Sequence, residues 1–230
     1  MTLEVIFYCK SLVMKNKFLK GAHLSEKEVR ELIHYFCEDV SASEIAQNSK
    51  ISRITVNAYF KLFRTRILEF LMDELTEQDA YNDPNLLLTN VYGVKVVDGN
   101  VITQPIYLSE DIVNAMKRLR KIEISNFLLD QKVCEFQAII DFKSIRIFKM
   151  KASQDYHLIE NYWSDMKVRL VKSRGINRKT LLLHVKEIEL RQRFKGQNFH
   201  YFLTQLLTQN KKVVSLKSSF KLPALESIAI

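Results

Sequence analysis

A series of polar side chains between residues 52 and 64 has the types and spacing needed to hydrogen-bond another molecule. They fall in the segment SRITVNAYFKLFRTRILEFL (52–71), which begins with a serine at the position of a helix cap. Short hydrogen-bonding groups at the start of such a helix suit the base edges of the DNA major groove, and the cations that follow suit phosphates. The predicted DNA-binding residues of this helix are Ser52, Arg53, Thr55, Asn57, Lys61 and Arg64.

The residues that precede this helix predict how it is held. The segment 25–40, SEKEVRELIHYFCEDV, opens with Ser25 and has Glu28 three residues later, which is the pattern of a capping box. Its apolar residues recur at helical spacing, and Ser43 is the cap candidate of a second, shorter helix. Two short helices, a turn and a longer helix form the layout of a helix-turn-helix motif, although any three-helix bundle shares this pattern. The packing residues expected for the motif are Ala46, Ile51 and Val56.

A single acid, Glu160, stands beside the chain's only tryptophan in IENYWSDMK (159–167). The segment 157–172 is predicted to be a helix that turns one apolar face to the core. Glu160 falls on an adjacent face together with Ser164 and Lys167, so spacing alone predicts a solvated charge. The residues expected on the core face are Ile159, Trp163, Met166 and Leu170.

Composition narrows the function classes. The 230 residues carry a net charge of +9, and residues 151–230 hold 15 Lys/Arg against 6 Asp/Glu, which favours a polyanionic partner such as nucleic acid, with a solvated basic face as the alternative. Three widely separated cysteines lack metal-ligand spacing, and no glycine-rich phosphate loop is present. No apolar run is long enough to span a membrane, and no signal peptide is recognisable, so we expect a cytoplasmic protein.

The remaining pattern predicts a mixed second half, and hence an α+β (mixed α/β) chain. Asp98-Gly99 between two β-rich runs is typical of a hairpin, and IRIFKM (145–150) is a further strand candidate. The acidic, polar segment after residue 75 indicates a linker. Helices are expected at 109–121, 157–172, 178–194 and 199–209. The predicted organisation is a head at 15–75, a linker at 76–90, a second domain at 91–210 and a tail at 211–230.

The segment from Ile159 to Phe194 resembles the end of the catalytic domain in small bacterial insertion-sequence transposases. Its I-E-N-[FY]-W-S motif corresponds to 159–164, followed by Lys167, Gly175-Ile176 and the KEIELR of 186–191. The predicted helix-turn-helix head and the segment VYGVKVVDGNVITQPI are similar to that group as well, so the likeness covers most of residues 17–205. The resemblance implies a three-helix head and a truncated RNase H-like domain with a helical C-terminus.

The resemblance also implies a metal-dependent chemistry. Transposases of this class transfer DNA strands with three carboxylates that hold two Mg²⁺ ions. The third carboxylate falls on Glu160, the second on Asp130 at the end of ISNFLLD, and Asp79 is the nearest counterpart of the first. Glu160 and Asp130 are thus the predicted metal ligands. Double-stranded DNA, including transposon inverted repeats, is the implied partner, and a homo-oligomer is compatible with it. The cations after Glu160 that we expect to meet DNA are Lys167, Arg169 and Lys172.

The chain departs from this group at the first carboxylate. The D-E-S-Y-F-G segment of the leading strand is absent, and Leu158 stands where the group has a glycine before Ile-Glu. Three hypotheses therefore stay open. The chain is a DNA-binding transposase that acts through Mg²⁺, or a transposase remnant that binds DNA without catalysis, or an unrelated helix-turn-helix regulator with an α+β sensor domain.

Overall fold

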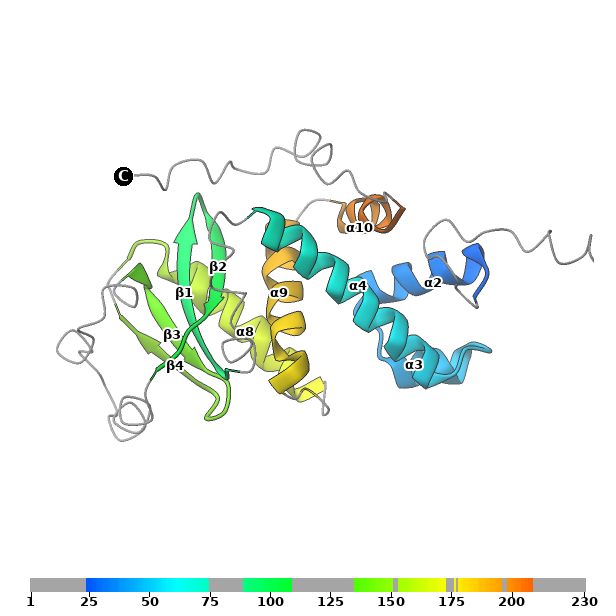
Figure 1. The fold of residues 1–230 in the computed structure, drawn as a ribbon, viewed down its shortest axis with the longest axis horizontal. Coiled ribbons are helices and arrows are strands. Elements are labelled where there is room, and N and C mark those ends of the chain that lie inside the picture. The colour runs from blue at the N-terminus through cyan, green and yellow to red at the C-terminus, as the bar shows by residue number, and fades with distance from the viewer. Residues whose placement is uncertain are drawn as a thin grey trace, which may run out of the picture. The chain divides into compact units, whose positions relative to one another are not determined.

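The computed structural model describes residues 24–74, 89–108, 135–150, 153–172, 176, 178–195 and 198–208. Contacts divide the chain into two compact units. The described residues 24–66 and 198–208 form the first, called the head unit below, and those between 67 and 195 form the second, the sheet unit. The division falls within a long helix, nearer the N-terminus than the boundary at residue 75 that the sequence predicts. Figure 1 gives the elements of both units.

The head unit contains the three predicted helices. They are α2 (Glu26–Cys37), α3 (Ala42–Asn48) and the first part of α4 (Arg53–Glu74). The capping box of α2 is confirmed, because the backbone N–H of Ser25 donates to Glu28 Oε2 at 2.7 Å and the Glu28 N–H donates to Ser25 Oγ at 3.3 Å. The expected cap at Ser43 is wrong. Ser41 caps α3 instead, since its Oγ accepts the N–H of Glu44 at 3.2 Å.

The chain reverses early enough after α2 for Ser41 to reach this position. Asp39 has φ 58°, the left-handed conformation that ends a helix, and the N–H of Val40 still bonds to the Tyr35 carbonyl at 3.0 Å. The next helix can therefore start two residues sooner than Ser43 would allow.

Aromatic rings fill the core of the head unit. Phe36 of α2 meets the rings of Phe60 and Phe63 of α4, with centroids 5.1 and 5.6 Å away. A fourth helix, α10 (Phe199–Thr208), packs against α2, and its His200 ring lies 6.1 Å from that of His34. The sequence predicts that this segment belongs to the second domain, whereas in the structure α10 packs against α2 of the head unit. The residues that α10 buries are Phe202, Leu203, Leu206 and Leu207.

The sheet unit is built on four antiparallel strands in the order β2-β1-β3-β4. Asp98 (φ 50°) and Gly99 (φ 74°) both adopt the left-handed conformation between the paired residues Val97 and Asn100, so the predicted two-residue hairpin is confirmed. The predicted strand at 145–150 is also found. The bounds are β1 (Val91–Val97), β2 (Asn100–Pro105), β3 (Ala138–Asp141) and β4 (Arg146–Lys149).

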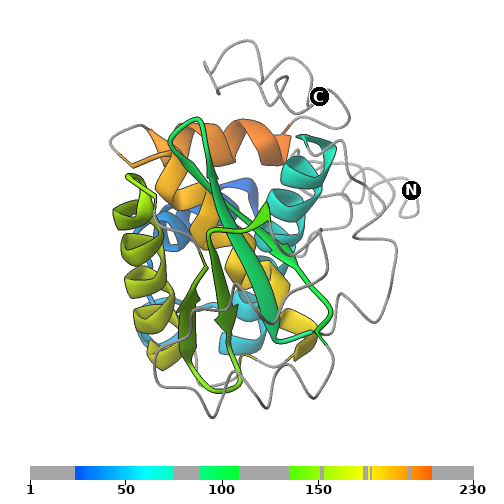
Figure 2. The same cartoon turned by 90° about the vertical axis from the view of Figure 1, so that its left-hand side faces the viewer.

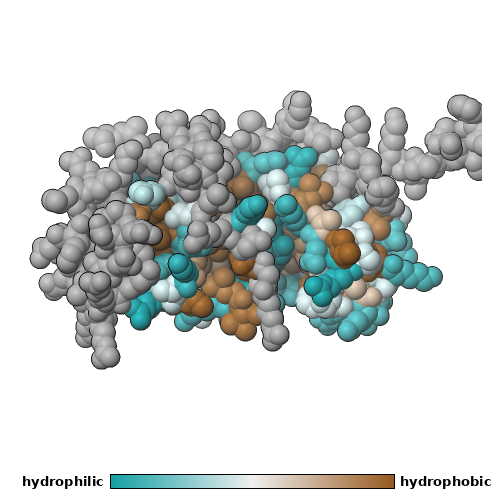
Figure 3. All heavy atoms as spheres, turned by 60° about the horizontal axis from the view of Figure 1, so that its bottom comes forward, coloured by the Kyte–Doolittle hydropathy of each residue, from teal (hydrophilic) through white to brown (hydrophobic). Residues whose placement is uncertain are grey.

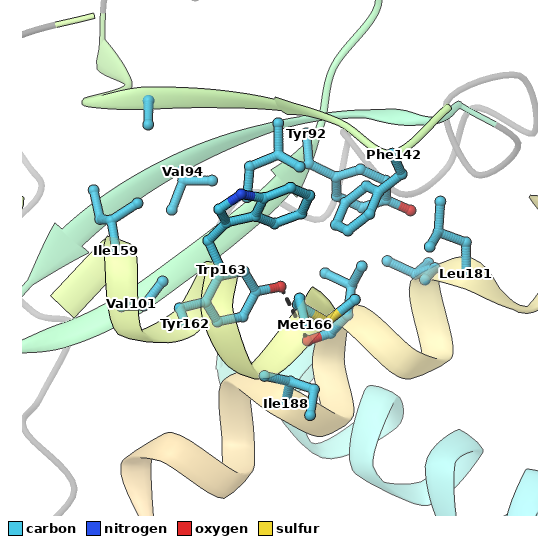
Figure 4. Close-up of a cluster of buried hydrophobic side chains, with 14 residues drawn as sticks. Tyr92, Val94, Val101, Phe142, Ile159, Tyr162, Trp163, Met166, Leu181 and Ile188 are labelled. Atoms are coloured by element: carbon cyan, nitrogen blue, oxygen red, sulfur yellow. Dashed lines mark hydrogen bonds between the residues drawn. The ribbon is translucent and has the colours of Figure 1, made fainter. Parts of the chain in front are cut away.

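Two helices, α8 (Tyr156–Lys172) and α9 (Arg178–Arg193), cover one face of this sheet (Figures 1 and 2). Trp163 of α8 contacts the Phe142 ring at 5.8 Å between the strands and the helices (Figure 4). Ile159, Trp163 and Met166 are buried as predicted, and Leu170 packs against the same core. The opposite face carries a smaller apolar cluster around Ile139 and Phe136.

These elements make the chain α+β, as the composition and periodicity predict. Among the described residues, no helix is long and apolar enough to cross a membrane. The predicted helix at 109–121, most of the predicted linker and the predicted tail lie outside the described residues.

Candidate nucleic-acid interface

The start of α4 is fixed by two of the predicted DNA-binding residues. Ser52 Oγ accepts the backbone N–H of Thr55 at 3.1 Å and lies 2.9 Å from Thr55 Oγ1. The sequence prediction that Ser52 caps this helix is therefore confirmed. Because both hydroxyls take part in the cap, they fix the residue at which α4 begins.

Three further predicted residues share one exposed face of α4. Arg53, Asn57 and Lys61 are all exposed, and their spacing of four residues aligns them along the helix. Over α2 to α4, Figure 3 shows a mostly hydrophilic face with a few hydrophobic side chains among the polar ones. One further residue of this side of α4 has no polar group that would mark it in the sequence. Ile54 is 84% exposed although it is a large apolar residue.

Arg64 is less exposed than these three residues, although helical spacing puts it on the same side of α4 as Arg53. Its guanidinium lies over the rings of Phe36 and Phe60, 5.4 and 5.9 Å from their centroids, and the residue is half-buried. Arg64 follows Phe60 by four residues, so its long apolar stem covers the aromatic core and its cation stacks on the rings.

Charge is divided unevenly within the head. Residues 25–40, which contain α2, hold two Lys/Arg and five Asp/Glu. Residues 41–66, which contain α3 and the head part of α4, hold five Lys/Arg and one Glu. A phosphate backbone is therefore attracted to the α3–α4 side of the head and repelled from α2.

Glu160 lies exposed on α8, as its helical spacing predicts. Its carboxylate is close enough to Tyr156 to act on that phenol, whose pKa is raised first by burial and then by the charge of Glu160. The Lys149 ammonium lies 4.2 Å from the centre of the same ring. Glu160 thus sits in a polar surface region beside Tyr156 and Lys149.

The carboxylates that the resemblance pairs with Glu160 cannot be compared with it, because Asp79 and Asp130 lie outside the described residues. Within the described ranges, no group of three His, Cys, Asp or Glu side chains could hold a metal ion. A hollow of about 80 Å³ in the sheet unit is lined by amide, cationic and apolar side chains, including Asn161, Lys195 and Leu158, and Glu160 is not among its lining residues. Such a lining does not fit Mg²⁺, which prefers carboxylates and water.

The cations that follow Glu160 differ in exposure. Lys167 and Lys172 are exposed, and the Lys167 ammonium lies 5.9 Å from the centre of the Trp163 ring. Arg169 is buried, and its Nη2 pairs with Glu187 Oε1 at 3.1 Å. The expectation that Arg169 meets DNA is therefore wrong, because its position on α8 turns it toward α9 and a buried carboxylate.

The KEIELR segment of α9 forms a buried ionic cluster at the edge of the sheet. Lys186 Nζ donates to the Thr103 carbonyl at 2.7 Å and to Glu189 Oε2 at 2.8 Å. The same carboxylate oxygen accepts the Thr103 N–H at 3.1 Å and its hydroxyl at 2.7 Å, while Arg193 Nη2 reaches Glu189 Oε1 at 3.0 Å. We call these four residues, Thr103, Lys186, Glu189 and Arg193, the edge cluster.

The edge cluster supplies hydrogen-bond partners to the outward-facing backbone groups of Thr103 in β2. Thr103 pairs with Val94 in the β1–β2 ladder at a position whose backbone groups point away from β1. Lys186 and Glu189 supply the donor and acceptor that a neighbouring strand would otherwise offer. In this chain Lys186 and Glu189 of the KEIELR segment therefore have a structural role.

The edge cluster also shifts the pKa values of two side chains, Glu189 and Tyr162. Burial opposes ionisation of Glu189, but the charges of Lys186 and Arg193 and the bonds from Lys186 and Thr103 outweigh it, so the Glu189 pKa lies below its ordinary value of 4.5. The pKa of the neighbouring Tyr162 is raised well above 10, first by complete burial and next by the Glu189 charge. At neutral pH the cluster therefore holds an ionised glutamate beside a neutral phenol.

Comparison with known proteins supplied no relative for this chain. No family model, no curated protein and no solved structure matches it.

Proposed function

We propose that this chain is a DNA-binding protein that inserts the N-terminal part of α4 into the major groove of double-stranded DNA. The observation that carries the proposal is the exposed face of Arg53, Asn57 and Lys61 on a helix that Ser52 caps. The layout of α2, α3 and α4 supports it, as does the concentration of positive charge in residues 41–66.

Each side chain of this face has a distinct task. Arg53 has the geometry to hydrogen-bond guanine, and the Asn57 carboxamide can pair with adenine through two hydrogen bonds. Lys61, one turn further along α4, meets a phosphate and contributes affinity without reading sequence. The transposon inverted repeats implied by the resemblance are the DNA we would test first.

The experiment compares two variants on two duplexes. A preferred site is selected from random DNA with the wild-type protein, and affinity is measured for that site and for an unrelated duplex. Arg53→Ala combined with Asn57→Ala should weaken the selected site far more, since each base contact is worth about 1–3 kcal/mol. Lys61→Gln, the matched variant on the same face, should weaken both duplexes equally. An equal loss on both duplexes from the first variant would refute base reading by α4.

A second candidate function is metal-dependent strand transfer on an RNase H-like domain. The exposed Glu160 within the I-E-N-Y-W-S motif favours it, and Asp130 and Asp79 are its proposed partners. The described residues do not supply the Mg²⁺ site, so no catalytic step is derived. Nicking of inverted-repeat DNA in Mg²⁺ or Mn²⁺ that is lost in Glu160→Gln and kept in Glu135→Gln would establish this activity. Without such nicking, the chain is a non-enzymatic DNA-binding protein.

A further inference from the structure

Ile54 is a large apolar residue that does not contribute to the core of the head unit. Its neighbours Ile51 and Val56 are buried at 6% and 0% exposure, whereas Ile54 is 84% exposed. A polar residue would serve the second position of α4 equally well, because the cap there is made by Ser52 and Thr55. The exposed Ile54 is therefore available for contact with another molecule.

The position of Ile54 on α4 defines what that molecule must offer. With about 100° between successive helical residues, Arg53, Asn57, Lys61, Ile54 and Ala58 follow one another around one side of α4 within about 140°. All five are exposed. The stripe is thus polar along one border, at Arg53 and Asn57, and apolar along the other, at Ile54 and Ala58.

A major groove that accepts this stripe must offer an apolar group beside its hydrogen-bonding groups. The 5-methyl group of thymine is the apolar group that the bases present there. Ile54 and Asn57 are three residues apart, which places their Cβ atoms about 5–6 Å from each other. Neighbouring base pairs are about 3.4 Å apart along the duplex, so the two side chains can contact adjacent pairs. The small Ala58 lets the helix approach the methyl group closely.

We infer that Ile54 is a specificity-determining residue that packs on a thymine methyl group, next to the base pair read by Asn57. This inference rests on the proposed function, and it names the class of site that the head binds. The preferred duplex contains a thymine whose methyl group is required, adjacent to an adenine.

Deoxyuridine replaces thymidine with the loss of the methyl group alone, so it provides the test. After selection of a preferred duplex, each thymine is replaced in turn and the Kd of the wild-type chain is measured. One or two positions should lose about fourfold in affinity, because burying one such group is worth about 0.8 kcal/mol. Ile54→Ala should bind thymine and uracil equally at those positions, and Ile54→Val should retain most of the difference.

Ile145→Ala is the matched control. Ile145 is also an exposed isoleucine, at 56%, but it lies in the turn between β3 and β4 of the sheet unit. This variant should keep the full preference for thymine. Circular dichroism should show the same melting curve for Ile54→Ala as for the wild type, since no buried group is removed.

The outcomes separate the inference from the proposed function. If the wild-type chain binds a selected duplex but tolerates uracil at every position, the role of Ile54 is refuted and DNA binding stands. The same conclusion follows if Ile54→Ala retains the fourfold difference. If the wild-type chain binds no duplex, both the inference and the proposed function fail.

Discussion

Replacing Lys186 by methionine should destabilise the sheet unit by about 3–5 kcal/mol, the range measured when one partner of a buried ion pair is removed. Lys186 is fully buried and bonds both the Thr103 carbonyl and Glu189. Methionine keeps the volume but leaves the carbonyl without its donor and Glu189 with less compensation. Arg193 and the Thr103 donors remain on Glu189, so we expect the lower end of the range.

The assay is urea unfolding followed by the fluorescence of Trp163. This is the chain's only tryptophan, and it is buried in the core of the sheet unit, so its signal reports on that unit. A loss of about 3 kcal/mol is large beside the 5–15 kcal/mol that stabilises an ordinary domain. Lys143→Met is the control, since Lys143 is an exposed lysine of the same unit and should change stability by less than about 0.5 kcal/mol.

A double variant distinguishes loss of charge compensation from simple loss of packing. In Lys186→Met combined with Glu189→Gln, the amide oxygen can still accept the Thr103 donors, but no buried negative charge remains. The double variant should therefore lose at least about 1 kcal/mol less than the sum of the two single variants. A loss below about 1 kcal/mol in Lys186→Met, or strict additivity in the double variant, would refute the role assigned to the edge cluster.

Three further predictions concern charge and packing. Because the Glu189 pKa is lower in the folded chain than its ordinary 4.5, its contribution to the free energy of unfolding is present above that pH and is lost as pH falls through the folded pKa. Glu189→Gln should therefore flatten the fall in urea stability below about pH 4.5. Gly93→Ala should destabilise the sheet unit by about 1–3 kcal/mol in the same assay, because the added Cβ would collide with the Phe136 ring. Arg169→Gln should lower the free energy of unfolding without changing duplex affinity, since its partner is the buried Glu187; a shift in Kd with unchanged stability would reverse that assignment.

Local patterns were enough to predict most elements of the fold. The capping box at Ser25 and the hairpin at Asp98-Gly99 depend on residues that lie next to one another in the chain, and both are confirmed. Trp163 faces the core for the same reason, because its apolar neighbours recur at helical spacing. Ser41 and Ser43 both lie near the start of α3, and only the turn at Asp39 decides which of them caps the helix. The prediction of Ser43 is wrong for this reason.

Contacts between distant segments could not be predicted in this way. Residues 181–190 of α9 are all buried, although Lys186, Glu187 and Glu189 would be assigned to a solvated face by their type. The burial of Lys186 and Glu189 depends on β2, more than 80 residues earlier, whose Thr103 needs side-chain partners. That of Glu187 depends on Arg169 of α8. The packing of α10 against α2 could not be predicted for a similar reason, since the apolar residues of α10 do not indicate which helix they contact.

In the candidate interface too, the exposure of some residues follows from helical spacing, and that of others depends on contacts that the spacing does not reveal. Arg53, Asn57 and Lys61 are exposed where helical spacing predicts a polar face. Arg64 and Arg169 are predicted to meet DNA because they are cations. In the structure Arg64 is half-buried against aromatic rings, and Arg169 pairs with the buried Glu187. The partners proposed for Glu160 were inferred from resemblance, and they lie outside the described residues.

The edge cluster has a consequence for solubility. An uncovered strand edge is a template on which a second copy of the chain can add a strand. At Thr103 that template is closed by the Lys186 ammonium on the carbonyl and by an oxygen of Glu189 on the N–H, and loss of either group reopens one of these two positions. In a growing cell, loss of the Lys186 ammonium would therefore favour self-association of the chain through this edge as well as destabilise the sheet unit.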